Sequence, residues 1–170
     1  MKGFGLLSII VSVFPAAHMA KVFVYGTLKE GQPNYFRIKD KAEFVAHART
    51  VDPYPLVIAT EYNIPFLLNV PGTGQRVHGE IYSVDQKMLE FLDEFEKCPQ
   101  MYQRTLIRLE VQDGPGGGEH KPEAGSSIEA YVYTTDTYEP EWLEKTTYES
   151  YNSNGDHGLR FVGRENRRPE

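Results

Sequence analysis

Short apolar runs separated by turn-forming residues recur along the chain and predict a protein rich in β-strands. β-Branched and aromatic residues cluster in these runs, as they do in strands. Proline, glycine and asparagine lie between the runs, as in the Asp52-Pro53 and Asn63-Ile64-Pro65 segments, and predict turns. The strands are expected at residues 22–25, 44–51, 55–59, 66–70, 77–84, 102–111 and 128–133.

One segment has the periodicity of a longer helix. Asp85 can cap its first turn and Pro99 ends it. Apolar residues recur at helical spacing between them and would form one face, namely Met88, Leu89, Phe91, Leu92 and Phe95. A single helix among many strands predicts an α+β fold, with a curved, mostly antiparallel sheet or barrel against which the helix packs.

The domain organisation is expected to be simple. The chain of 170 residues, 40% of them hydrophobic, fits one globular domain, which we place at residues 19–170. Residues 113–127 contain five glycines and two prolines without apolar periodicity, and predict a mobile loop between two strands.

Residues 1–18 have two interpretations that the sequence leaves open. Lys2, an apolar run and the small residues Ala16 and Ala17 have the outline of a secretory signal. Alternatively, Met19 is a start site and the segment is an extension. The lone cysteine, Cys98, and the lack of an Asn-x-Ser/Thr site favour a reducing compartment, so we expect a cytosolic protein, with secretion as the alternative.

Charge and histidine spacing exclude several kinds of partner. The formal net charge is −6, and no basic stretch with interleaved aromatic residues precedes the tail, which argues against nucleic acid. The arginines at residues 160–168 are expected to be a solvated C-terminus. The five histidines lack metal-site spacing, so no metal is implied, and no stable membrane association is expected, because the apolar run near the N-terminus is too short to span a bilayer.

The first strand stops at a glycine, and this is the first candidate site. Val22 to Tyr25 are strand-favouring, and Gly26 permits backbone angles or close approaches that a side chain would prevent. Backbone N–H groups at such a strand end can bind a carboxylate or an oxyanion. An ordinary structural turn is the alternative from this pattern alone.

The second candidate is a carboxylate on the apolar side of the predicted helix. At about 100° per residue, Glu96 falls about 20° from Leu89 and about 40° from Leu92. Desolvation at such a position would raise the pKa of the carboxyl group, which suits a general acid or base. The alternative is that the helix frays before Glu96 and leaves the side chain in water.

Several motifs together resemble the γ-glutamyl cyclotransferase-like family, and within it the branch that acts on γ-glutamylamines. The resemblance covers residues 19–167 approximately. Its motifs are Val22-Phe23-Val24-Tyr25-Gly26-Thr27-Leu28, Lys29-Glu30-Gly31-Gln32-Pro33-Asn34, Pro55-Leu56-Val57-Ile58, Asn63-Ile64-Pro65, Gly79-Glu80-Ile81-Tyr82, Leu92-Asp93-Glu94-Phe95-Glu96, Cys98-Pro99, Met101-Tyr102-Gln103-Arg104, His157-Gly158-Leu159-Arg160 and Arg164-Glu165-Asn166-Arg167.

This resemblance implies a small mixed β-barrel with flanking helices and an enzyme that needs no cofactor. The implied substrate is the small molecule γ-glutamyl-ε-lysine, left when transglutaminase cross-links are degraded, and the products are 5-oxo-L-proline and lysine. The family's catalytic glutamate falls on Glu96, and its substrate-binding loop falls on Tyr25, Gly26, Thr27 and Leu28.

Three alternatives stay open at this point. The enzyme could act on other γ-glutamyl amino acids or on glutathione, or the chain could be a non-catalytic member of the fold that binds a small ligand. Tyr102 is expected to pack in the core rather than line a site, and Cys98 is expected to be a structural thiol.

Overall fold

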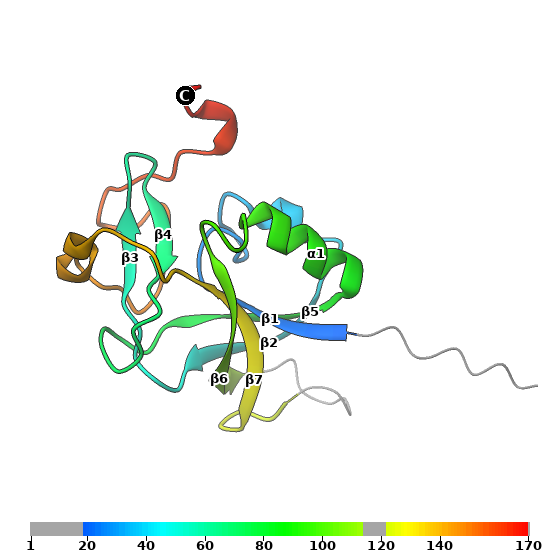
Figure 1. The fold of residues 1–170 in the computed structure, drawn as a ribbon. Helices are drawn as coiled ribbons and strands as arrows, with labels where there is room; N and C mark the ends of the chain where they lie inside the picture. Colours follow the sequence, from blue (N-terminus) through cyan, green and yellow to red (C-terminus); the bar gives the residue numbers. More distant parts are fainter. Residues whose placement is uncertain (1–18, 114–121, 170) are drawn as a thin grey trace, which may run out of the picture.

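A closed β-barrel of five strands forms the body of the protein (Figure 1). This computed structural model describes residues 19–113 and 122–169. The strands follow the order β1-β5-β2-β6-β7 around the barrel. Neighbours are antiparallel except β1 and β7, which pair in parallel at Val22 and Tyr131. The bounds are β1 Met19–Val24, β2 Glu43–Thr50, β5 His78–Asp85, β6 Gln103–Asp113 and β7 Ser127–Thr134. The expected mixed, mostly antiparallel barrel is confirmed.

The second half of strand β1, Val22 to Val24, is buried on both faces, which explains its apolar sequence. Phe23 joins a core cluster that draws residues from all five strands and fills the barrel, while Val22 and Val24 join a second cluster outside it. Alternate side chains of a strand point to opposite faces, so each face of β1 needs apolar residues. Gly79 on β5 lets the strands approach, because a Cβ there would lie 2.7 Å from the Phe23 ring.

Helix α1 (Gln86–Phe95) covers the outer wall of the barrel, as its apolar face predicts. The Asp85 side chain accepts a 2.7 Å hydrogen bond from the Met88 N–H, which caps the first turn. At the other end the Lys97 N–H donates to the Glu94 carbonyl and the Cys98 N–H to the Asp93 carbonyl. These two bonds form a Schellman motif, which ends the helix sharply before Pro99.

Strands β3 (Leu56–Ala59) and β4 (Ile64–Leu67) form a separate hairpin beside the barrel (Figure 1). The expected strand at residues 66–70 therefore begins two residues earlier, and the expected turn at residues 63–65 is wrong. The turn spans residues 60–63, where Thr60 and Asn63 take positive φ. Pro65 is tolerated in β4 because a two-stranded sheet has only edge strands.

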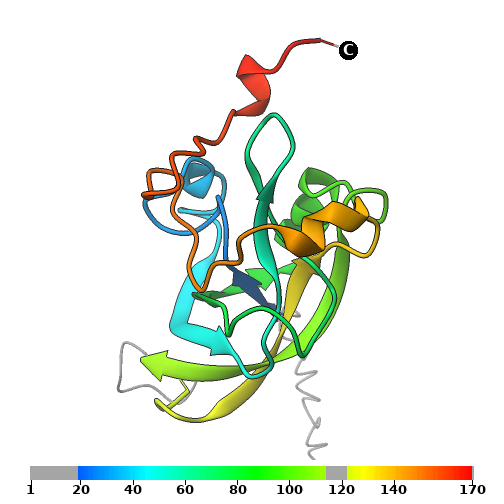
Figure 2. The same ribbon diagram turned by 90° about the vertical axis from the view of Figure 1, so that its left-hand side faces the viewer.

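The C-terminal segment returns along this hairpin and passes close to its tip (Figure 2). The Tyr148 N–H donates to the Leu56 carbonyl, and the Val162 N–H donates to the Tyr62 carbonyl at 2.9 Å. Besides α1, the described residues include three short 3₁₀ helices, η1 Tyr35–Arg37, η2 Pro140–Glu144 and η3 Arg164–Asn166. The last of these lies beyond the hairpin tip.

Two sequence predictions fall mostly outside the described residues. Residues 1–18 lie outside them, and so does most of the predicted loop at residues 113–127, of which β6 and β7 provide the two ends. Within the described ranges, no helix is long and apolar enough to cross a membrane.

Lys97 should be replaceable by glycine with a gain in stability. Its φ of 52° is left-handed, a conformation that costs a residue with a Cβ roughly 1–2 kcal/mol. After the greater unfolded-state freedom of glycine is subtracted, Lys97→Gly should raise the free energy of unfolding by about 0.5–1 kcal/mol in urea denaturation. Glu90→Gly, on the exposed side of α1, is the control and should lose about 1 kcal/mol. A loss for Lys97→Gly would contradict the stated backbone strain.

Candidate active site

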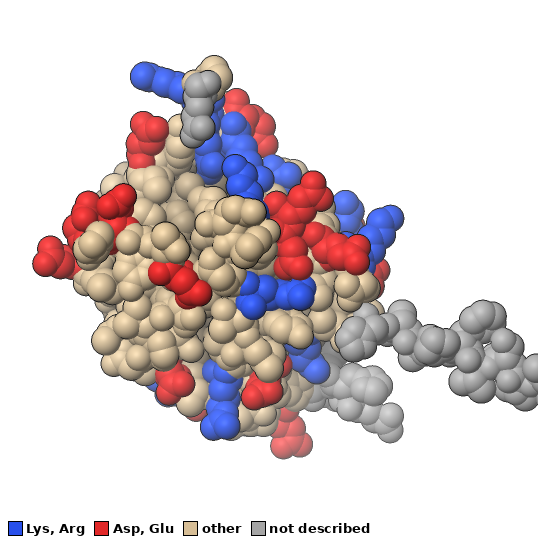
Figure 3. Space-filling model, viewed as in Figure 1, with Lys and Arg blue, Asp and Glu red and all other residues tan. Residues whose placement is uncertain are grey.

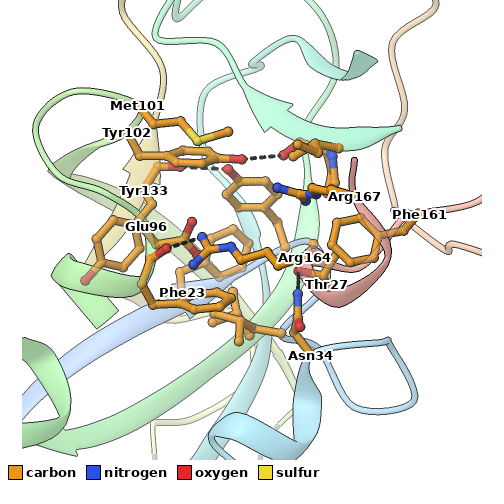
Figure 4. A pocket seen from close by; sticks show the side chains of 17 residues that line it. Phe23, Thr27, Asn34, Glu96, Met101, Tyr102, Tyr133, Phe161, Arg164 and Arg167 are labelled. Atoms are coloured by element: carbon orange, nitrogen blue, oxygen red, sulfur yellow. Dashed lines mark hydrogen bonds between the residues drawn. The ribbon is translucent and has the colours of Figure 1, made fainter. Parts of the chain in front are cut away.

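One cavity lies where the end of β1, the end of α1, the β3–β4 hairpin and the C-terminal segment meet (Figure 4). Its volume of about 60 Å³ is several times the roughly 10–15 Å³ that a single water needs, so it suits a small molecule. Every predicted site residue lines it. The lining residues are Phe23, Val24, Tyr25, Gly26, Thr27, Leu28, Asn34, Ile64, Pro65, Phe95, Glu96, Met101, Tyr102, Tyr133, Phe161, Arg164 and Arg167.

The loop after β1 has unpaired backbone N–H groups in residues that line this cavity. Among the described residues, the N–H groups of Gly26, Thr27 and Leu28 have no hydrogen-bond acceptor, although all three residues line the cavity. Gly26 is needed for close packing rather than for an unusual φ, because a Cβ there would lie 3.0 Å from the Pro65 ring. Successive free N–H groups facing a cavity form a site for a carboxylate or an oxyanion.

The Tyr25 side chain holds this loop against the rest of the protein. Its hydroxyl donates a 2.7 Å hydrogen bond to the Tyr133 carbonyl and accepts a 3.3 Å bond from the Leu67 N–H. Burial, followed by the nearby Glu96, raises the pKa of Tyr25 far above its usual value, so the phenol stays protonated. Tyr25 therefore joins β1, β4 and β7 at the edge of the cavity.

The far end of the loop is also fixed by hydrogen bonds. The Asn34 amide donates to the Thr27 hydroxyl at 3.0 Å, and the Asn34 N–H donates to the Thr27 carbonyl at 2.9 Å (Figure 4). The buried Glu80 carboxylate accepts from the Glu30 N–H and from the Tyr82 hydroxyl, both at 2.9 Å. Bracing at both ends keeps the free N–H groups in place for a ligand.

Glu96 enters the cavity from the end of α1 (Figure 4). Its N–H donates to the Leu92 carbonyl at 2.8 Å, so the helix continues up to Glu96 and the fraying alternative is wrong. Desolvation raises the pKa of the half-buried Glu96 carboxyl to about 7, although the positive charge of Arg164 opposes the rise. A carboxyl group with this pKa can both accept and donate a proton near neutral pH.

Asp93, three residues before Glu96, does not line the cavity, and its carboxylate is paired with other side chains. It accepts hydrogen bonds from the Tyr133 hydroxyl at 2.8 Å and from Arg104 at 2.9 Å. Its charge is thus matched by partners, whereas Glu96 faces the cavity.

The arginines near the C-terminus are a correction to the sequence analysis. They were expected to be solvated, but Arg164 and Arg167 line the cavity together with Phe161. Arg164 donates to the Phe95 carbonyl and lies 4.4 Å from the centre of the Phe95 ring. Their motif, Arg164-Glu165-Asn166-Arg167, contributed to the family resemblance, but it did not place them at the site, because only the path of the chain past the hairpin tip brings the tail to α1.

Tyr102 has both of the roles considered for it. Its ring stacks on Phe66 at 5.3 Å and its hydroxyl donates to the Pro65 carbonyl at 3.0 Å, yet it also lines the cavity.

Cys98 lies outside the cavity lining, and burial raises the pKa of its thiol to about 11, so it is a poor nucleophile near neutral pH. Within residues 19–113 and 122–169, no group of three or more histidine, cysteine, aspartate or glutamate side chains could hold a metal ion.

Comparison with known proteins shows the family of this chain. The family model described as γ-glutamyl cyclotransferase, AIG2-like, matches residues 22–153. The chain belongs to this family. Two similar members are γ-glutamylaminecyclotransferase B of Danio rerio, 66% identical over 85% of this chain and 74% of the relative, and γ-glutamylaminecyclotransferase of Homo sapiens, 50% identical over 88% of this chain and 100% of the relative.

A solved family structure has the same fold. The crystal structure of an AIG2-like protein from Mus musculus superimposes with a TM-score of 0.80 at 52% identity, covering 88% of this chain and 99% of that one. The family match includes the loop after β1 and Glu96. It ends at residue 153, so Arg164 and Arg167 line the cavity from outside the part of the chain that the family model matches.

Ionised Glu96 should destabilise the folded protein. Because its pKa is raised in the folded state from 4.5 to about 7, folding opposes ionisation, and stability should fall as pH rises through that interval. Glu96→Gln removes this penalty. The free energy of unfolding of the variant relative to wild type should therefore grow by about 2–3 kcal/mol between about pH 4 and about pH 8 in urea denaturation. A pH-independent difference would contradict the desolvated carboxylate.

Removing the charge of Arg164 should raise the pKa of Glu96 further. Arg164 favours the ionised form of Glu96, so Arg164→Gln should move the Glu96 carboxyl titration to higher pH, as followed by carbon NMR of labelled glutamate. Arg168→Gln, which changes an arginine that does not line the cavity, should leave the titration in place. Equal shifts in both variants would indicate a general charge effect instead.

Proposed function

We propose that this protein is a cofactor-independent γ-glutamylamine cyclotransferase that converts γ-glutamyl-ε-lysine to 5-oxo-L-proline and lysine. The observation that carries the proposal is the pairing, in one small cavity, of a carboxyl group of raised pKa with free backbone N–H groups. The names of the Danio rerio and Homo sapiens relatives support the choice of a γ-glutamylamine as substrate.

The substrate supplies its own nucleophile in this reaction. The glutamyl α-amino nitrogen attacks the γ-carbonyl carbon and closes a five-membered lactam, and the bond from that carbon to the lysine Nε breaks. No water or redox partner is consumed. The protein has to hold the glutamyl chain folded, move protons and stabilise the oxyanion that forms on the γ-carbonyl.

Glu96 is the residue assigned to proton transfer. It accepts a proton from the α-ammonium group, whose ordinary pKa is about 8, and returns one to the departing lysine amine. A glutamate at its ordinary pKa of 4.5 would be a weak acceptor, whereas a pKa of about 7 brings donor and acceptor close to balance. Desolvation of Glu96 therefore makes both transfers feasible near neutral pH.

The loop of Tyr25, Gly26, Thr27 and Leu28 is assigned to binding the glutamyl group. Its free N–H groups are suited to the glutamyl α-carboxylate or to the oxyanion, since both present lone pairs to fixed donors. The bracing by Tyr25, Asn34 and Glu80 keeps these donors oriented, so little reorganisation is needed during the reaction.

Replacing Glu96 by glutamine should abolish turnover without unfolding the protein. General acid–base catalysis is worth roughly 10²–10⁴ in rate, so Glu96→Gln should reduce 5-oxoproline release from γ-glutamyl-ε-lysine, measured by mass spectrometry, by at least about a hundredfold. Glu94→Gln, on the exposed side of the same helix, is the matched control and should keep wild-type activity. If folded Glu96→Gln kept more than about a tenth of the activity, the proton-transfer role would be wrong.

Assays of the wild-type protein with three substrates distinguish the proposed function from its alternatives. Side-by-side assays with γ-glutamyl-ε-lysine, an α-linked γ-glutamyl amino acid and glutathione should show fastest release of 5-oxoproline from the first. A preference for an α-linked substrate would change the substrate class. Binding without release of 5-oxoproline would indicate a non-catalytic member of the fold.

A further inference from the structure

Arg164 and Arg167 lie on the same side of the last short helix. They begin η3 and follow its end, and the Arg167 N–H donates to the Arg164 carbonyl at 3.3 Å. Residues three apart eclipse one another in a 3₁₀ helix. Both side chains therefore reach the same cavity from the C-terminal segment, opposite the end of α1 (Figure 4).

Neither guanidinium is neutralised by a carboxylate within 4.0 Å among the described residues. The neighbouring Glu165 forms its ion pair with Arg37, at 3.2 Å, and not with Arg164 or Arg167. Positive side chains gather around the C-terminal end of the molecule (Figure 3), although the whole chain has a net charge of −6. The side of the cavity that these two arginines line is thus a local site for an anion.

Arg167 is held so that its fork of N–H groups stays available. Its Nε donates to the Val162 carbonyl at 3.1 Å, and its guanidinium lies 4.8 Å from the centre of the Tyr62 ring. Its two Nη groups donate to no other residue in the part of the chain that the structure describes. Desolvation and the charge of Arg164 lower the pKa of Arg167, so an anion bound between the two would relieve an unfavourable charge.

A carboxylate fits these groups best, because a guanidinium binds one with two parallel hydrogen bonds. γ-Glutamyl-ε-lysine carries two carboxylates. The glutamyl one is attached to the carbon that carries the attacking amino group, so it belongs to the reacting end, whereas the lysine one lies beyond four methylene groups of the leaving amine. Arg164 and Arg167, which line the cavity from the C-terminal segment, are suited to that second carboxylate.

We infer that Arg167, with Arg164 beside it, binds the α-carboxylate of the leaving amino acid and so makes the site selective for γ-glutamylamines that carry a distal carboxylate. This inference rests on the proposed cyclotransferase function. The chain would then discriminate lysine from a simple diamine as the leaving group.

Two substrates that differ only in this carboxylate test the inference. γ-Glutamylcadaverine is γ-glutamyl-ε-lysine without the lysine carboxylate. A hydrogen bond between charged groups is worth about 1.5–3 kcal/mol, so wild type should have a kcat/KM roughly 10- to 150-fold higher for the lysine compound. Arg167→Ala should reduce this ratio to within about threefold of unity, mainly by raising KM for the lysine compound, and Arg167→Lys should restore part of it.

Matched controls separate binding of the carboxylate from loss of structure. Arg168→Ala, in the same segment but outside the cavity, should keep the wild-type ratio, and thermal unfolding should show that all variants are folded. Equal losses on both substrates in Arg167→Ala would overturn the inference, since both compounds carry the glutamyl carboxylate. A wild-type ratio near unity would overturn it too.

Failure of the proposed function would look different. In that case wild type would release 5-oxoproline from neither compound, and the inference would fall with the function. Release of 5-oxoproline from both at equal efficiency would refute only the role of Arg167.

Discussion

Burial of β1 on both faces is the constraint on which the structure depends. The strand closes the barrel by pairing with β5 on one side and β7 on the other, and its two faces serve two different cores. A strand held in this way can leave the barrel only at its end, where Gly26 packs against Pro65. The backbone N–H groups of the next residues, which line the cavity, are therefore left without partners.

The site combines this rigid loop with a carboxyl group that the fold keeps poorly solvated. Desolvation and Arg164 act on Glu96 in opposite directions, and desolvation is the larger, which leaves its pKa at about 7. The Schellman motif holds Glu96 at the C-cap of α1, directly after its last residue, and requires a left-handed backbone at Lys97. The left-handed backbone of Lys97 thus costs stability directly beside Glu96, the residue to which proton transfer is assigned.

Much of the fold and part of the site could be predicted from patterns in the sequence. The runs of β-branched and aromatic residues and the turn residues between them placed the barrel strands nearly correctly, and Asp85 and Pro99 bounded α1. The helical wheel singled out Glu96 because residues four and seven positions apart, such as Leu92 and Leu89 relative to Glu96, lie on the same face of a helix. The turn before β4 was placed too late, because Pro65 reads as a turn residue in sequence although an edge strand accepts it.

The sequence by itself determined the apolar run of β1, the glycine at its end and the position of Glu96 on the apolar side of α1. These are local properties, governed by residue type and by the period of the strand or helix. Only the tertiary structure decided that Arg164 and Arg167 share a cavity with Glu96, because they lie 68 and 71 residues later in the chain and their segment follows the hairpin before reaching α1. The raised pKa of Glu96 was likewise decided there, since desolvation depends on every neighbour that folding brings around the carboxyl group.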